Sequence, residues 1–201
     1  MRRFFVYFLM TFLFLNLSAQ KFQKIYESMT FEDKLWVIKN HDKVLRSVDI
    51  SKSVMKTMDS LDKIDFLGGN KEGGIFDAFR HIYWMYNLSS EVGEECARKV
   101  GEIYEGYGEY IFKTTEMSGY DSVGRQMDLF NNELGINLAK QSIKKRLVFS
   151  EIRKIIKLGK AKVVKKNQNG EDLDINGEII PTEEWKKSWN NRRVLVNSNE
   201  K

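Results

Sequence analysis

The stretch "GGIFDAFRHIYW" (residues 73–84) places an aspartate, an arginine and a histidine among large apolar side chains. On a helix, Asp77, His81 and Trp84 lie on one face, which we call the histidine face. The other positions of this helix are almost all apolar, which predicts that the helix is buried on every side. Asp77, Arg80 and His81 therefore need polar partners elsewhere in the chain, because an unpartnered buried polar group costs about 1–3 kcal/mol.

The partners are predicted in a second helical stretch, "GRQMDLFNNELGINLAK" (residues 124–140). Asp128, Asn132 and Gly135 share one side of this helix, which we call the asparagine face, and Asn131 lies at its margin. The rest of this face is Gly and Ala, so another helix can approach it closely. We therefore expect the histidine face to pack on the asparagine face.

Two roles fit these side chains, and both stay open. In a non-catalytic envelope or interaction protein they form a structural polar seam that fixes the register of two helices. In a metal-assisted hydrolase they hold a divalent cation such as calcium or magnesium, or act on water as base and orienting group. One histidine among oxygen ligands disfavours zinc. Polar clusters in helical cores are commonly structural, so the sequence favours the seam. The candidate catalytic residues are Asp77, Arg80, His81, Asp128 and Asn132, with Trp84 and Asn131 beside them.

The two stretches together resemble an uncharacterised bacterial family, domain of unknown function 6973. The family shows Asp-Ala-Phe-Arg-His with a Trp three residues on, a His-Glu pair, and Met-Asp-x-x-Asn-Asn-x-x-Gly. The resemblance covers residues 30–150 and implies an α-helical domain, often exported, with no established activity. The positions that match are Asp77, Arg80, His81, Trp84, Asp128, Asn131, Asn132 and Gly135.

The His-Glu pair of the family falls on Tyr104 and Glu105, so its histidine is replaced here. A metal site that needs this histidine is therefore not expected. The helical spacing of Val92, Cys96 and Val100 defines an apolar face, and Glu105 lies on the opposite side. We therefore expect Glu105 to be solvated.

A second metal-binding pattern occurs in "DLDINGEIIPTE" (residues 172–183), which fits the calcium-loop sequence. Alternate side chains of such a loop point inward, and Gly177 permits its sharp turn. Against calcium, Asn169-Gly170 directly upstream does not suit a helix entering the loop. An ordinary hairpin turn accounts for the same residues, so both interpretations stay open. The calcium ligands of the pattern are Asp172, Asp174, Asn176 and Glu183.

The first nineteen residues have the pattern of a cleavable signal peptide (residues 1–19). Met1-Arg2-Arg3 is basic, Phe4 to Leu15 is apolar, and small residues lead to a cleavage point after Ala19. The apolar run is shorter than the ~20 residues that a membrane span needs. We expect export, to the periplasm or the exterior, with an uncleaved anchor as the alternative. Cys96 is the single cysteine, so no internal disulfide forms, and its position on an apolar face predicts a buried, inert thiol.

The net charge of +5 is concentrated in residues 140–166, which hold eleven Lys and Arg residues and one Glu. Such a segment could bind an anionic envelope surface. The favoured alternative is a solvated helix face, because isoleucines recur between the charges. A nucleic-acid partner is not expected for an exported chain without stacking motifs.

The chain as a whole predicts an all-α fold: a bundle of five or six helices with a small C-terminal β-hairpin and a short helix. We expect a helical domain over residues 20–158 and a C-terminal tail over residues 159–201, packed on it through Trp185 and Trp189. Thr30, Ser89 or Ser90, and Asp121 or Ser122 are predicted helix caps. The predicted helices are 31–40, 47–63, 75–88, 90–113, 121–145 and 149–158. The predicted core residues are Phe79, Ile82, Trp84, Leu129, Phe130 and Leu134.

Overall fold

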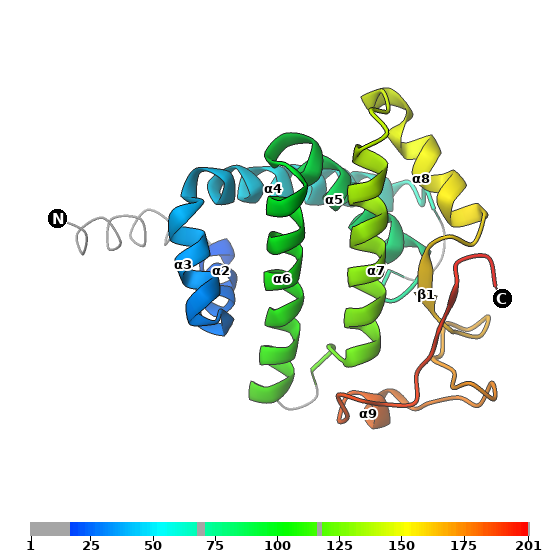
Figure 1. Cartoon of the computed structure of the whole chain (residues 1–201). Helices are drawn as coiled ribbons and strands as arrows, with labels where there is room; N and C mark the ends of the chain where they lie inside the picture. Colours follow the sequence, from blue (N-terminus) through cyan, green and yellow to red (C-terminus); the bar gives the residue numbers. More distant parts are fainter. Residues whose placement is uncertain (1–16, 68–70, 116–117, 201) are drawn as a thin grey trace.

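The computed structural model describes residues 17–67, 71–115 and 118–200 (Figure 1). These residues form eight α-helices and two short strands, which confirms the predicted class. The helices are α2 (Leu17–Ser28), α3 (Phe31–Lys39), α4 (His41–Lys63), α5 (Ile75–Val92), α6 (Glu94–Thr114), α7 (Ser122–Ala139), α8 (Val148–Lys157) and α9 (Thr182–Trp185), and the strands are β1 (Lys162–Val164) and β2 (Leu195–Asn197).

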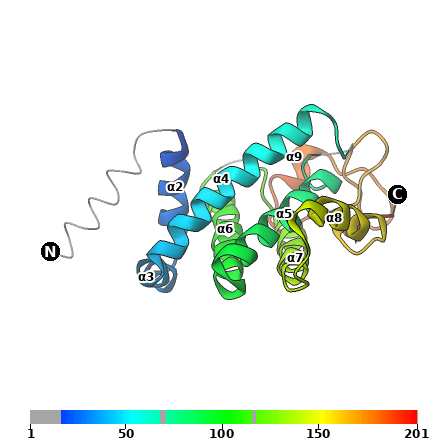
Figure 2. The ribbon, with the colours of Figure 1, turned by 90° about the horizontal axis from the view of Figure 1, so that it is seen from above.

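Helix α5 is the centre of the fold, because it packs against α4, α6, α7 and α8. Helices α6 and α7 run side by side in opposite directions, and α4 passes across one end of α6 (Figures 1 and 2). Phe79 and Ile82 on α5 are fully buried, as predicted. Trp84, Leu129 and Leu134 are only partly buried, and of these Trp84 and Leu134 pack against the edge of the core.

The prediction that Phe130 belongs to the core is wrong, since 43% of its surface is exposed. Helix α7 turns Met127, Asn131 and Gly135 inward, which leaves Phe130 on its outer side. There the Lys162 ammonium group lies 5.9 Å from the centre of the phenyl ring. Phe130 therefore carries a cation–π contact at the surface.

Local capping sets the ends of two helices as the sequence predicts. Thr30 and Asp33 form a capping box at the start of α3. Asp121 caps α7 by accepting a hydrogen bond from the backbone N–H of Gly124. The prediction of a cap at Ser89 or Ser90 is wrong, because α5 continues to Val92. The break before α6 comes instead from Gly93, whose φ of +91° suits a residue without a side chain.

The tail contains the small antiparallel sheet, but its strands are farther apart in sequence than the Asn-Gly pairs predicted. Strand β1 pairs with β2, with Val163 opposite Val196. The two Asn-Gly pairs do form turns, with Gly170 and Gly177 at positive φ. Each turn is closed by a single isolated bridge rather than a strand pair. The chain therefore folds back twice before β2 reaches β1.

Trp185 and Trp189 of the tail both pack against other side chains. Trp185, at the end of α9, is buried. The ring of Trp189 lies 5.3 Å from that of Phe112 on α6. The side chain of Arg193 stacks on Trp185 at 3.9 Å. The contact between Trp189 and Phe112 joins the tail to α6.

Several charges of residues 140–166 are engaged within the molecule. Lys140 pairs with Glu94 at 2.8 Å, and Lys166 pairs with Asp172 at 2.7 Å. The apolar residues of α8 at positions 148, 152 and 156 are buried, so its charged side faces solvent. Cys96 is buried, as predicted. Among the described helices, none is both long enough and apolar enough to cross a membrane.

Candidate metal centre

Helices α5 and α7 meet at a very close crossing at Gly135. A Cβ atom at this position would lie 2.3 Å from the carbonyl oxygen of Ile82 and 2.8 Å from the Cβ of Met85. Neither atom can move freely, since one is backbone and the other is the base of a buried side chain. Glycine is therefore required here, and it brings the histidine and asparagine faces together.

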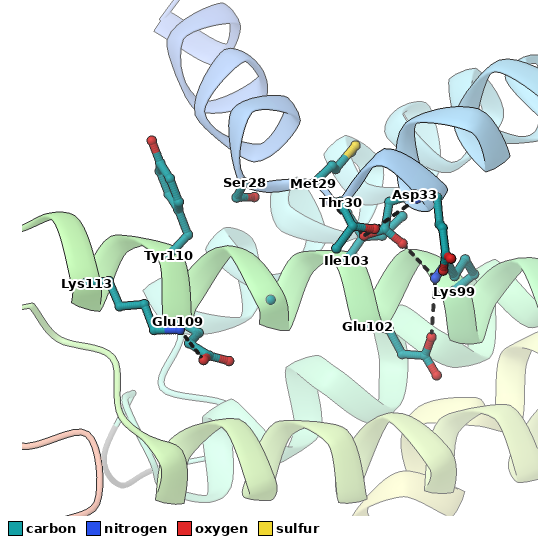
Figure 3. Close-up of a pocket in the computed structure, with 12 residues that line it drawn as sticks. Ser28, Met29, Thr30, Asp33, Lys99, Glu102, Ile103, Glu109, Tyr110 and Lys113 are labelled. Carbon is teal, nitrogen blue, oxygen red and sulfur yellow. Dashed lines mark hydrogen bonds and ion pairs between the residues drawn. The ribbon is translucent and has the colours of Figure 1, made fainter.

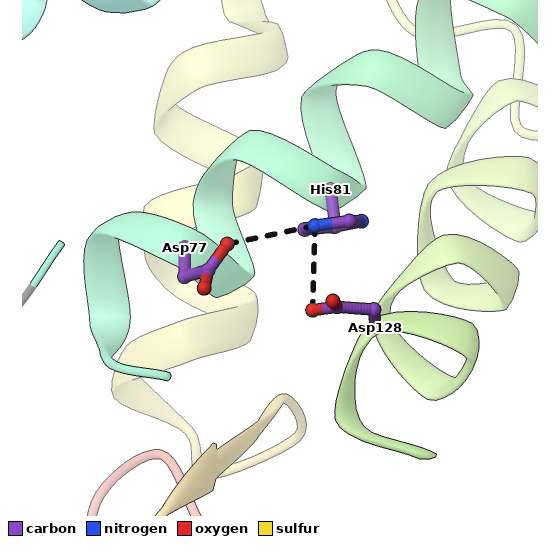
Figure 4. Close-up of side chains that lie close together, drawn as sticks. All are labelled: Asp77, His81 and Asp128. Atoms are coloured by element: carbon purple, nitrogen blue, oxygen red, sulfur yellow. Dashed lines mark ion pairs between the residues drawn. The ribbon is translucent and has the colours of Figure 1, made fainter. Parts of the chain in front are cut away.

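His81 lies at the centre of this crossing with 2% of its surface exposed. Its Nδ1 atom is 3.0 Å from Oδ1 of Asn132, an acceptor, so Nδ1 carries the proton. Its Nε2 atom then presents a lone pair, 3.3 Å from Oδ1 of Asp128 and 3.5 Å from Oδ1 of Asp77 (Figure 4). The structure thus confirms the predicted contact between the two faces.

Asp77 is held in place from two sides. Its Oδ2 atom accepts a hydrogen bond of 2.8 Å from the backbone N–H of Gly73, and its Oδ1 atom binds the Arg80 guanidinium. Arg80 also approaches Nε2 of His81, at 3.4 Å. The Arg80 side chain keeps 32% of its exposure, so it connects the buried cluster to solvent.

Glu105 corrects the sequence prediction, because it is buried with 5% of its surface exposed. The helical face of α6 that packs inward is marked by small residues rather than large apolar ones. Ala97, Gly101 and Gly108 lie on it at one-turn spacing with Glu105. The apolar spacing of Val92, Cys96, Val100, Ile103 and Tyr107 predicts a different inward face and so puts Glu105 on the wrong side. The small-residue spacing, together with the family's His-Glu pair, is the signal that could have placed Glu105 inside.

Four buried polar atoms around this crossing have no hydrogen-bond partner: Asp128 Oδ1, Asn132 Nδ2, Glu105 Oε1 and Arg125 Nε. Arg125 and Asn132 lie within one helical turn of Asp128 on α7. Most native proteins leave only a few such atoms per hundred residues, so a concentration of them at one point needs an explanation. A bound ligand with its own charge and hydrogen bonds is one explanation.

Several ionisable groups of the cluster also have pKa values far from their ordinary ones. Burial lowers the pKa of His81 to about 4, although Asp77 opposes the shift, so the imidazole is neutral at pH 7. Burial, reinforced by Asp77 and Glu105, raises the pKa of Asp128 well above its ordinary value. Burial and Asp77 together raise the pKa of Glu105 to about 8. The carboxyl groups of Asp77, Asp128 and Glu105 lie in or beside the same buried cluster, where Asp77 raises the pKa of the other two, and a bound cation would favour their ionised forms.

The ligand atoms of Asp77, His81 and Asp128 lie within 4.8 Å of one another. Among the described residues, this is the set of His, Cys, Asp and Glu side chains gathered closely enough for one metal ion. One neutral imidazole nitrogen with two carboxylate oxygens suits magnesium or manganese. Asn132 acts behind His81, where its amide oxygen fixes the ring orientation.

Two other predicted site residues surround the cluster without joining it. Asn131 is fully buried and bonds both backbone groups of Lys162 at the start of β1, at 2.9 and 3.1 Å. Trp84 donates its indole N–H to Ser51 at 2.8 Å and packs edge-on against Tyr104. Asn131 therefore ties α7 to the sheet, and Trp84 ties α5 to α4.

The residues of the calcium-loop pattern are placed differently. The Asp172 carboxylate pairs with Lys166 at 2.7 Å. Asp174 pairs with Arg192 at 2.9 Å and accepts two backbone N–H bonds within its own turn. Asn176 and Glu183 are exposed. The two buried carboxylates already have cationic or amide partners.

A separate cavity of about 550 Å³ lies between the α2–α3 corner and α6 (Figure 3). Its lysines are paired within its wall, Lys99 with Asp33 and Lys113 with Glu109, each at 2.7 Å. None of its lining residues belongs to the cluster around His81. We therefore place the candidate centre at the α5–α7 crossing.

The fold and this centre define an α-helical domain with a buried Asp–His–Asp cluster between two tightly crossed helices. The family described as a domain of unknown function (DUF6973) matches residues 34–167, and the chain belongs to this family. The match includes Asp77, His81, Glu105 and Asp128. No curated protein and no solved structure matches the chain.

Proposed function

We propose that this domain is a divalent-cation-dependent hydrolase whose metal ligands are Asp77, His81 and Asp128. One observation carries the proposal: an imidazole lone pair and two carboxylate oxygens converge within 4.8 Å in a buried site. A purely structural seam would satisfy its own polar groups. Here Oδ1 of Asp128 is buried without a hydrogen bond, which a cation would supply with a partner.

The residues around the proposed cation site support hydrolytic chemistry. A divalent cation held by Asp77, His81 and Asp128 would make water acidic enough to act as a nucleophile near neutral pH and would polarise the bond under attack. Arg80 reaches from the cluster toward solvent, where its guanidinium can bind an anionic part of a substrate. The ligands come from α5 and α7, whose close packing at Gly135 keeps them in position.

Export is part of the proposal and rests on the sequence of residues 1–19. Cleavage after Ala19 would leave Gln20 as the first residue of the mature chain. Expression with this leader in a bacterium, followed by mass spectrometry of the exported fraction, tests it. A mature N-terminus at Gln20 is expected, and a chain that stays full length in the membrane fraction would contradict it.

The metal claim is tested by elemental analysis and calorimetric titration with Mn²⁺. We expect one ion per chain in the wild type and none in His81→Ala. His41→Ala is the matched control, because His41 is the other histidine and half of its side chain is exposed. If the wild type binds no Mn²⁺ at millimolar concentration and His81→Ala only lowers stability, the cluster is the structural seam that the sequence favoured.

A further inference from the structure

The position of Glu105 follows from the packing of α6 on α7. A Cβ atom at Gly101 would lie 3.2 Å from Nδ2 of Asn132, so these two residues face each other. The two helices are antiparallel neighbours (Figure 1). One turn forward on α6 is Glu105, and one turn back on α7 is Asp128. Glu105 is therefore level with Asp128, on the inward side of α6.

The Glu105 carboxyl group has no role within the protein that its contacts explain. It is buried, and Oε1 makes no hydrogen bond. Burial raises the pKa of Glu105 most strongly, Asp77 raises it further, and Arg80 and Arg125 lower it. Glu105 therefore interacts electrostatically with the polar side chains of α5 and α7. A buried carboxyl group without a hydrogen-bond partner lowers the stability of the fold, and such groups are concentrated at functional sites.

Glu105 is close to the three ligands but does not belong to the set whose atoms lie within 4.8 Å of one another. Glu105 is therefore not placed to coordinate the same cation directly together with all three ligands. A carboxylate outside this set would reach a cation at the three ligands through a water molecule bound to the ion. Carboxylates in this outer position commonly orient what the metal binds.

We propose that Glu105 is the outer carboxylate of the cation site, accepting a hydrogen bond from a water molecule bound to the ion. This inference rests on the proposed function. It makes Glu105 a positioning residue that holds the water on the α6 side of the ion. Burial of Oε1 without a hydrogen-bond partner in the protein is then explained, since its partner would be the water bound to the ion.

The test is Mn²⁺ binding to the full chain, measured by electron paramagnetic resonance together with water-proton relaxation. For Glu105→Gln we expect affinity to fall about tenfold, as is typical for an outer-shell change, with the relaxation per bound ion unchanged. The matched control is Glu102→Gln, which changes an exposed carboxylate three residues before Glu105 on α6. Its Mn²⁺ affinity should stay within about twofold of the wild type.

Two results would overturn the inference while leaving the proposed function intact. Equal affinities of Glu105→Gln and Glu102→Gln would show that Glu105 has no part in the site. A higher relaxation per ion in Glu105→Gln would show that an extra water has replaced a direct ligand. If Glu105→Gln does not fold, Glu105→Met gives the same comparison. A wild type that binds no Mn²⁺ would instead overturn the proposed function and this inference together.

Discussion

Nε2 of His81 on α5 lies 3.3 Å from Oδ1 of Asp128 on α7, although 47 positions separate the two residues in the sequence. Asn132 holds the opposite ring nitrogen, so the lone pair of Nε2 points at the carboxylates. The contact depends on how closely the two helices approach. The approach, in turn, depends on one glycine.

Gly135→Ala is expected to be strongly destabilising and to abolish Mn²⁺ binding. Its Cβ would lie 2.3 Å from a backbone oxygen, so α5 and α7 must separate. Overpacking of this kind costs about 1–3 kcal/mol or more. Gly106→Ala on α6 is the control: its Cβ meets no atom within 4 Å, and it should be neutral or stabilising by up to about 1 kcal/mol. Urea unfolding measures both, and equal effects would refute the close crossing.

We expect the titration of Glu105 to make the free energy of unfolding depend on pH. Its pKa is raised from 4.5 to about 8 in the folded protein, so the folded state binds more protons than the unfolded state between these values. The free energy of unfolding therefore falls as pH rises through this window, by on the order of 4 kcal/mol from this group. Glu105→Gln removes this titrating group. The free energy of unfolding of the variant should therefore increase relative to that of the wild type from pH 5 to pH 8 in buffer without divalent cations. Parallel profiles from chemical denaturation would contradict the buried position.

Arg193 is expected to fasten the tail to the start of α7. Its guanidinium makes bonds of 2.8 and 2.6 Å with both oxygens of Asp121, which is almost fully buried and caps the helix. Arg193→Ala leaves this carboxylate unpaired and should cost about 3–5 kcal/mol in thermal or urea unfolding. Lys187→Ala is the control in the same tail, where an exposed side chain is lost and little change is expected. Equal effects of the two would show that the buried pair contributes nothing.

Calcium at millimolar concentration is expected to cause no rise in melting temperature that depends on Asp172 or Asp174. Asp172 and Asp174 are held by Lys166 and Arg192, so an ion at this turn would have to break both pairs. Differential scanning fluorimetry with and without calcium decides the matter. A saturable rise in melting temperature that Asp174→Asn removes would restore the calcium-loop interpretation.

Much of the fold was predictable because local signals agree with one another. The capping box at Thr30 and the acid at Asp121 mark helix starts that the structure confirms. The contact between the histidine face and the asparagine face was predictable for a different reason. The polar groups of neither face find hydrogen-bond partners within their own helix, and Gly135 marks a point where another helix can approach closely.

The failures have physical causes of their own. The apolar pattern misplaces Glu105 because glycines, which carry no hydrophobic signal, mark the buried face of α6. Phe130 was assigned to the core by its side chain, although its helix turns amides and small residues inward there. The partner of β1 was missed because strand pairing between residues about thirty positions apart leaves no local trace in the sequence.

The central claim is that Asp77, His81 and Asp128 hold one divalent cation. The most direct test is a crystal structure of the protein grown with Mn²⁺, with anomalous diffraction recorded at the manganese absorption edge. The account predicts an anomalous peak about 2.0–2.3 Å from Oδ1 of Asp77, Nε2 of His81 and Oδ1 of Asp128. An ordered structure with no peak at this position, and with His81 still bonded only to its protein neighbours, would contradict it.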